Sequence, residues 1–200
     1  MGFFDNLKKN FQSEVNKTVN ASAKEAGKAV QNAVSNKSLT FTFTELPKDV
    51  EELKALPESA LDTPFKTTAL ALAALCNYEK DTEATYGMLD FLKGPDAVSE
   101  YEKQFYKERL TGKCYKVFSF FAGATVENGY KPSVPYTVTV TANAYSYPEE
   151  NRATMWVQSS GADSLRSVKL RKKPSTGQWF ITEIQCLSDI RIPAAEDPWA

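Results

Sequence analysis

Carboxylates are the side chains in this sequence that could perform acid–base chemistry. Two carboxyl groups facing each other across a glycosidic bond can act as a general acid and as a base or nucleophile. The C-terminal half offers candidates for such a pair: Glu127, Glu149, Glu150, Asp163 and Glu183. Nothing in their spacing selects one pair, because the chain has 25 acidic residues, an ordinary number for a solvated surface. The sequence therefore leaves enzymatic activity uncertain and leans towards a non-enzymatic protein.

The chain has no histidine, and this absence excludes several chemistries. Within one chain it rules out Ser-His-Asp and Cys-His catalysis and histidine-ligated zinc. The three cysteines, Cys76, Cys114 and Cys186, lack the paired spacing of a zinc site or a disulfide framework. No glycine-rich phosphate-binding motif occurs. We therefore expect no metal and no cofactor.

Charge indicates little about partners, because 24 basic residues nearly balance the acidic ones, and we expect no nucleic-acid partner. One basic cluster stands out in the C-terminal third: Arg166, Lys169, Arg171, Lys172 and Lys173. It could hold phosphate or RNA. We favour the alternative of a solvated β-hairpin whose lysines discourage pairing with another sheet edge.

Residues 1–38 form a segment of distinct composition, which we call the arm. Apolar residues recur in it at steps of three and four, a pattern that predicts a long amphipathic helix. The arm carries six lysines and three acidic residues, a net charge of +3. The residues predicted to contact a membrane or a partner lie near its start: Phe3, Phe4, Leu7, Lys8, Phe11 and Val15.

Three interpretations of the arm remain open. A basic amphipathic helix with aromatic residues at its tip can lie in the interface of an anionic membrane. The same helix can pack on its own domain, on a protein partner or on a second copy, which makes a homo-oligomer an alternative. The alanine-rich second half could also order only on contact.

The elements that would position any site begin with helices in the middle third. Pro64–Tyr78 is apolar almost all round, which predicts a buried helix with Thr63 as N-cap. Capping signals predict three more helices. One begins at Asp49 and ends before Pro57, one runs from Asp81 or Thr82 to Gly94, and one runs from Ser99 to Gly112.

Strands are predicted elsewhere by alternation of apolar and polar residues. Leu39–Thr44 alternates strictly, and so does Tyr136–Ala144, in which threonines make one face polar. Ala153–Ser159, Leu165–Lys172 and Trp179–Cys186 follow, separated by short turns. Four strands joined by short turns are typical of an antiparallel meander.

A family resemblance rests on several runs: Leu39–Pro47, Asp62–Cys76, Gly123–Tyr130 with Pro132, Pro135–Val140 and the ending Asp197–Ala200. These runs resemble a family of uncharacterised bacterial domains of unknown function over residues 38–200, with the arm as an extension. The resemblance implies no activity and no catalytic residues.

We therefore predict an α+β fold. A helical layer from residue 48 to 111 covers an antiparallel meander sheet of four to five strands, with Leu39–Thr44 as the candidate fifth strand. We expect two parts, the arm at 1–38 and a single domain at 39–200. A pocket between helices and sheet is expected to have a rim formed by Gly123, Glu127, Asn128 and Tyr130.

The leading functional hypothesis is a non-enzymatic cytoplasmic binding or interaction module, brought to a membrane surface or a partner by the arm. The alternative is a soluble domain that binds a small ligand or performs carboxylate-dependent hydrolysis, with the arm used for oligomerisation. No signal-peptide pattern or long apolar span occurs in the sequence. We therefore expect a cytoplasmic location, or a peripheral one at the inner membrane face.

Overall fold

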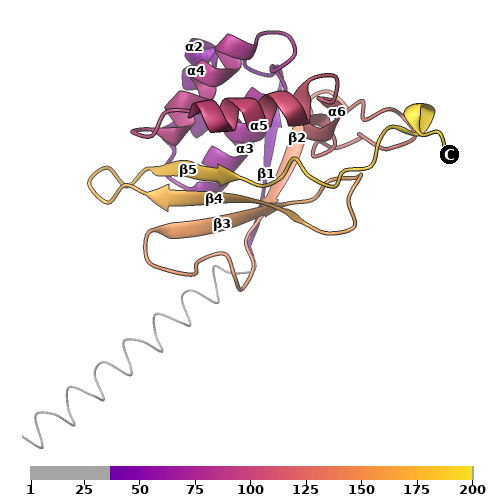
Figure 1. Ribbon diagram of the computed structural model, residues 1–200. Coiled ribbons are helices and arrows are strands. Elements are labelled where there is room, and N and C mark those ends of the chain that lie inside the picture. Colours follow the sequence, from indigo (N-terminus) through magenta and orange to yellow (C-terminus); the bar gives the residue numbers. More distant parts are fainter. Residues whose placement is uncertain (1–36, 200) are drawn as a thin grey trace, which may run out of the picture.

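The computed structural model describes residues 37–199, which form five α-helices packed on a five-stranded antiparallel sheet (Figure 1). The predicted α+β fold is thus confirmed for this part of the chain, while the arm up to residue 36, and its predicted helix, lie outside the described residues. The strands are β1 (Ser38–Phe43), β2 (Tyr136–Thr141), β3 (Arg152–Val157), β4 (Arg166–Lys172) and β5 (Trp179–Ile184). The helices are α2 (Val50–Ala55), α3 (Pro64–Leu75), α4 (Thr82–Lys93), α5 (Glu100–Leu110) and α6 (Tyr115–Phe118), with short 3-10 turns η1 (Pro57–Ala60) and η2 (Ala194–Glu196).

Helix α3 lies at the centre of the molecule and contacts four of the five strands. Of its residues, only Lys66 is not buried. The Thr63 hydroxyl caps the first turn by accepting a hydrogen bond from the Lys66 N–H, and Pro64 occupies the first helical position. The Thr67 hydroxyl is buried too, and it donates to the Trp179 carbonyl 2.9 Å away. The prediction of a buried helix is confirmed.

The strands follow one another in the order β1-β2-β3-β4-β5, every pair antiparallel. The predicted meander is therefore correct, and the first strand joins it beside β2. Strands β2 and β3 pair only through Val140–Val157 and Thr141–Trp156. Earlier along β2, Val138 instead bridges to Phe121, so the segment after α6 fills the gap where β3 diverges.

The two faces of the sheet differ in polarity. Apolar side chains of every strand point into the helical layer, with Phe41, Val138 and Met155 among the buried ones. The opposite face carries threonines of β1 and β2, whose hydroxyls pair across the strands, as in Thr40–Thr139 at 2.9 Å. The predicted solvated face is present.

Side-chain caps place the helix starts where the sequence predicts them. The Asp49 carboxylate accepts from the N–H groups of the first turn of α2, and Asp81 does the same for α4. Ser99 and Glu102 form a reciprocal capping box at the start of α5. The helical layer extends past residue 111, however, because the short helix α6 follows α5.

No helix within residues 37–199 combines the length and the apolar character needed to cross a membrane.

Candidate functional site

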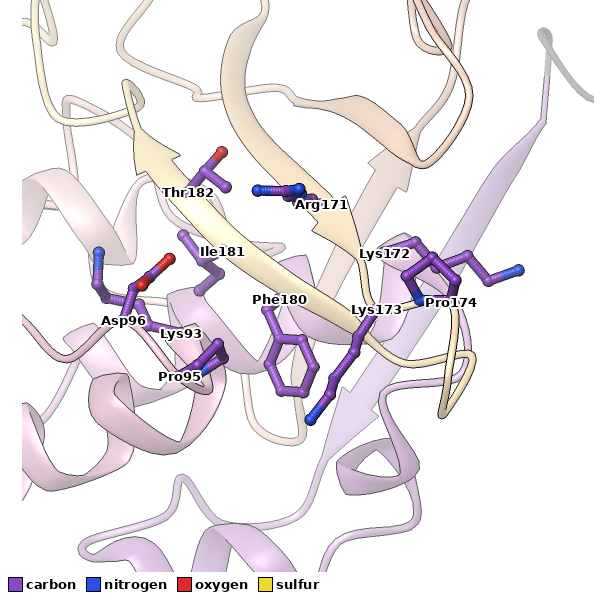
Figure 2. A pocket seen from close by; sticks show the side chains of 10 residues that line it. All are labelled: Lys93, Pro95, Asp96, Arg171, Lys172, Lys173, Pro174, Phe180, Ile181 and Thr182. Carbon is purple, nitrogen blue, oxygen red and sulfur yellow. The ribbon is translucent and has the colours of Figure 1, made fainter.

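A pocket of about 240 Å³ lies where the end of α4 meets the β4–β5 hairpin (Figure 2). We call it the hairpin pocket. The loop after α4 forms one wall, and β4, the turn after it and β5 form the other. Its lining residues are Lys93, Pro95, Asp96, Arg171, Lys172, Lys173, Pro174, Phe180, Ile181 and Thr182.

The floor of the hairpin pocket is apolar because of a close approach between α4 and β5. Helix α4 ends at Lys93, and Gly94 follows with φ of +69°, a conformation that glycine adopts readily. A Cβ atom at Gly94 would lie 2.5 Å from the Phe180 ring, so only glycine lets the ring pack against this turn. Ile181 and Pro95 complete the apolar surface.

Lys93 is held in the pocket wall by an ion pair. Its side chain is 7% exposed, and its Nζ lies 2.6 Å from Oε1 of Glu102, the third residue of α5. Glu102 also accepts hydrogen bonds from the backbone N–H and the hydroxyl of Ser99. Burial alone would raise the pKa of Glu102, but the hydrogen bonds from Lys93 and Ser99 outweigh it and lower that pKa. The Glu102 carboxyl therefore stays ionised near neutral pH, and its ion pair with Lys93 ties α4 to α5.

Cations without a partner carboxylate lie along the other wall. Arg171 and Lys173 are exposed, and within residues 37–199 neither forms an ion pair or a hydrogen bond from its side chain. Figure 2 shows Lys173 extending beside the Phe180 ring, whereas Lys172 points away from it and lies over the Trp179 ring, 6.0 Å from its centroid. Asp96 is the one carboxylate among the lining residues.

This arrangement favours a ligand that has both a charged part and an apolar part. An apolar floor next to uncompensated positive charge suits an anionic group attached to an apolar body. The Arg171 guanidinium can donate two parallel hydrogen bonds to a carboxylate or a phosphate. From the sequence alone these cations are predicted to form a solvated hairpin surface. Their closeness in sequence to Pro174 and Phe180 is the signal that could identify them as pocket residues. The sequence around Lys93 and Pro95 contains no comparable signal that these residues line a pocket.

Two larger pockets flank the loop that follows β1, and they suit an anion less well. One, of about 400 Å³, is lined by three carboxylates, Glu45, Glu52 and Glu58, and by no cation. The other, of about 440 Å³, includes Lys48 and Lys80. Lys48, however, is paired with Glu52 at 3.8 Å.

The predicted pocket rim consists of residues that hold one loop in shape. The Asn128 amide donates to the carbonyls of Gly123 and Lys131, and its oxygen accepts from the N–H groups of Thr125 and Lys131. Tyr130 is 1% exposed. Its hydroxyl donates to the Arg191 carbonyl at 2.7 Å, and its ring stacks on another aromatic ring, that of Tyr115.

Glu127, the remaining member of this predicted rim, is exposed. Hydrogen bonds from its own backbone N–H and from the Thr125 hydroxyl lower the pKa of its carboxyl. None of the four rim residues lines the three pockets described here, and their role at a binding site stays a prediction. The predicted arm contacts Phe3, Phe4, Leu7, Lys8, Phe11 and Val15 lie outside the described residues.

The surroundings of the three cysteines disfavour the reactive thiolate form. Cys76, Cys114 and Cys186 are free and buried. Burial, reinforced for Cys114 by the charge of Glu79, raises the pKa of Cys114 to about 12, and burial also raises that of Cys186 to about 12. Burial raises the pKa of Cys76 well above its usual value. No group of three or more Cys, Asp or Glu residues within 37–199 is arranged to hold a metal ion.

Comparison with known proteins agrees with the resemblance seen in the sequence. No curated protein and no solved structure matches this chain. One family model matches residues 45–194, which include all five helices, strands β2 to β5 and the whole hairpin pocket. The chain therefore belongs to the family described as Domain of unknown function (DUF6935).

Proposed function

We propose that this protein is a non-enzymatic binding module. Its folded domain holds a ligand with an anionic group and an apolar body in the hairpin pocket, and its arm recruits the domain to a membrane surface. The observation that carries the proposal is the pairing of the Phe180 floor with the uncompensated charges of Arg171 and Lys173.

Two features support binding rather than hydrolysis. A catalytic acid of a glycosidase needs a raised carboxyl pKa. Within the described residues, the carboxyls with a shifted pKa are Glu102, Glu127 and Glu183, and all three are lowered. For Glu183 the leading cause is the hydrogen bond from Lys169. The lining of the hairpin pocket contains one carboxylate and therefore no acid–base pair of its own.

Calorimetric titration of the full chain with phenyl phosphate tests the ligand class. This probe combines an anion with an apolar ring, whereas inorganic phosphate and benzyl alcohol each supply one part alone. We expect phenyl phosphate to bind at least tenfold more tightly than either, since only it uses both the charges and the floor. Equal affinity for inorganic phosphate and phenyl phosphate would show that the apolar floor does not contribute to binding.

Two variants with the same change of charge locate the site. Lys173→Gln removes a cation from the pocket wall, and Lys169→Gln removes one from the same hairpin outside the pocket, where it pairs with Glu183 at 2.8 Å. We expect the dissociation constant for phenyl phosphate to rise about three- to tenfold in Lys173→Gln and to stay unchanged in Lys169→Gln. Equal increases of the dissociation constant in the two variants would mean that the affinity depends only on the net charge of the protein.

Co-sedimentation with anionic liposomes tests the arm. We expect the full chain to pellet with the vesicles, and a Phe4/Leu7/Phe11→Ser variant to remain in the supernatant, because apolar burial anchors an interfacial helix. A chain starting at Ser38 is the matched control for loss of the whole arm. If the full chain does not bind but assembles through the arm, the arm is an oligomerisation segment and the membrane role is wrong.

A further inference from the structure

Strand β1 has an outer edge whose backbone groups find no partner in the described part of the chain. The Ala142 N–H donates to the Lys37 carbonyl at 2.8 Å, which makes Lys37 and Ala142 a hydrogen-bonded pair. Because such pairs alternate along an antiparallel ladder, the N–H and C=O groups of Ser38, Thr40 and Thr42 point away from β2. No hydrogen bond from another residue of 37–199 reaches these outward groups.

The opposite edge of the sheet is covered at the start of β5. The outward N–H of Trp179 in β5 donates to the Leu61 carbonyl at 2.8 Å, and the Trp179 carbonyl accepts from the Thr67 hydroxyl. A register irregularity between Lys169 and Leu170 further distorts the β4–β5 ladder. Bulges and covering segments are the usual means by which proteins prevent edge-to-edge pairing.

Within residues 37–199, strand β1 has neither a bulge nor a covering segment. Its sequence, Ser-Leu-Thr-Phe-Thr-Phe, contains no charge, proline or glycine, and its pairing with β2 is regular over all six residues. Such an edge is a template for another strand.

A second copy of β1 fits this edge. With a two-fold axis at Thr40, the outward groups of Ser38 face those of Thr42 in the other copy, which gives about six main-chain hydrogen bonds. Leu39, which is partly exposed, then lies opposite Phe41 of the other copy. The threonine hydroxyl rows on the polar face would continue across the axis.

Charge sets the direction of the pairing. Exposed Lys37 precedes β1, and exposed Glu45 follows it. Antiparallel pairing places Lys37 of one copy at the same end as Glu45 of the other, whereas parallel pairing would bring the two lysines together. The two copies of Lys37 then lie at opposite ends of the joined strands.

We propose that this protein forms a two-fold homodimer in which β1 pairs antiparallel with β1 of a second copy, joining two five-stranded sheets into one. The interface is small and mostly main-chain, and it is independent of the hairpin pocket, which lies beside β5 at the other edge (Figures 1 and 2).

Sedimentation equilibrium of the full chain from about 10 to about 300 µM tests the dimer. We expect association of the natural chain. Thr40→Lys and Thr40→Glu each place like charges across the axis and should raise the dimer dissociation constant at least tenfold. An equimolar mixture of the two variants should associate again, because the charges facing each other are then opposite.

Thr139→Lys is the matched control. Thr139 pairs with Thr40 on the same polar face but one strand further from the axis, so the same added charge should leave association unchanged. The proposal is wrong if the natural chain is monomeric over this range. It is also wrong if Thr40→Lys associates as tightly as the natural chain, or if the Lys and Glu variants fail to recombine although circular dichroism shows both folded.

Amide hydrogen exchange provides a second readout on the natural chain. Dimerisation should slow exchange at the Thr40 and Thr42 N–H groups as the protein concentration rises. Slow exchange at all concentrations in a monomeric chain would mean that residues 1–36 cover the edge, and would overturn pairing with a second copy.

Discussion

Gly94 lies directly against Phe180, so close that a Cβ atom at position 94 would come within 2.5 Å of the ring. This contact joins the end of α4 to the edge strand β5 and forms the floor of the hairpin pocket. The end of α4 and the shape of the pocket floor therefore depend on the same glycine.

Gly94→Ala should destabilise the fold and weaken the pocket. The new methyl group meets the Phe180 ring, and φ of +69° is unfavourable for alanine. We expect a loss of about 2 to 4 kcal/mol in the free energy of unfolding, measured by urea denaturation, together with weaker phenyl phosphate binding.

Gly112→Ala separates the two causes of that loss. Gly112 has a similar φ of +68°, but a Cβ there would meet nothing within 4 Å. It should cost only the backbone strain, about 1 kcal/mol, and leave ligand affinity unchanged. Equal losses for the two substitutions would show that the contact with Phe180 contributes nothing.

The ion pair between Lys93 and Glu102 should respond unequally to removal of its partners. Glu102→Gln leaves the Lys93 ammonium, 7% exposed, without a carboxylate, and we expect a loss of about 2 to 3 kcal/mol in the free energy of unfolding. Lys93→Met leaves a carboxylate that is more exposed and still bonded to Ser99, and it should cost about 1 kcal/mol. A larger loss for Lys93→Met would contradict this asymmetry.

The same pair should make the fold acid-sensitive. Folding lowers the pKa of Glu102 below its usual value of 4.5. Its contribution to stability is therefore fully present above the unfolded-state pKa and disappears as the pH falls through the lower, folded-state value. Urea denaturation between pH 7 and pH 3 should show a smaller acid-induced loss in Glu102→Gln than in the natural chain. If the free energy of unfolding falls equally in both proteins between pH 7 and pH 3, Glu102 is not a source of the acid sensitivity.

Asn128 should matter for stability and not for binding in the hairpin pocket. Asn128→Ala removes a side chain that bonds to Gly123, Thr125 and Lys131, and we expect a loss of about 1 to 2 kcal/mol. The neighbouring Glu127→Ala, also at an exposed position, should leave the free energy of unfolding nearly unchanged. If either variant weakens phenyl phosphate binding, the predicted rim takes part in a binding site.

The three thiols should be unreactive in the folded protein. Because burial raises the pKa of Cys114 and Cys186 to about 12, little thiolate exists near neutral pH. Ellman's reagent at pH 8 should label none of the thiols within minutes in the native protein and all three in guanidinium chloride. Rapid labelling of one cysteine in the native state would reveal an accessible, activated thiol.

Local signals explain why the helices and strands could be predicted from the sequence. Asp49, Asp81 and Ser99 cap helices through their own side chains, and those contacts span only a few residues. Alternation of threonine with apolar residues in β2 likewise sets which face is buried. Helix α6 was missed because it has four residues and its N-cap, Cys114, makes no capping bond. It forms where tertiary packing holds it.

What the sequence by itself determined is the set of elements, their order and the polarity of their faces, because these follow from caps, turns and periodicity within short stretches. Only the tertiary structure decided which distant residues meet. The end of α4 packs against Phe180. Within residues 37–199, β1 lies at an uncovered edge of the sheet, while Leu61 and Thr67 bond to the start of β5 at the other edge. Such contacts depend on how the layers pack and on which strands become edges. Both are properties of the whole fold that no local pattern encodes.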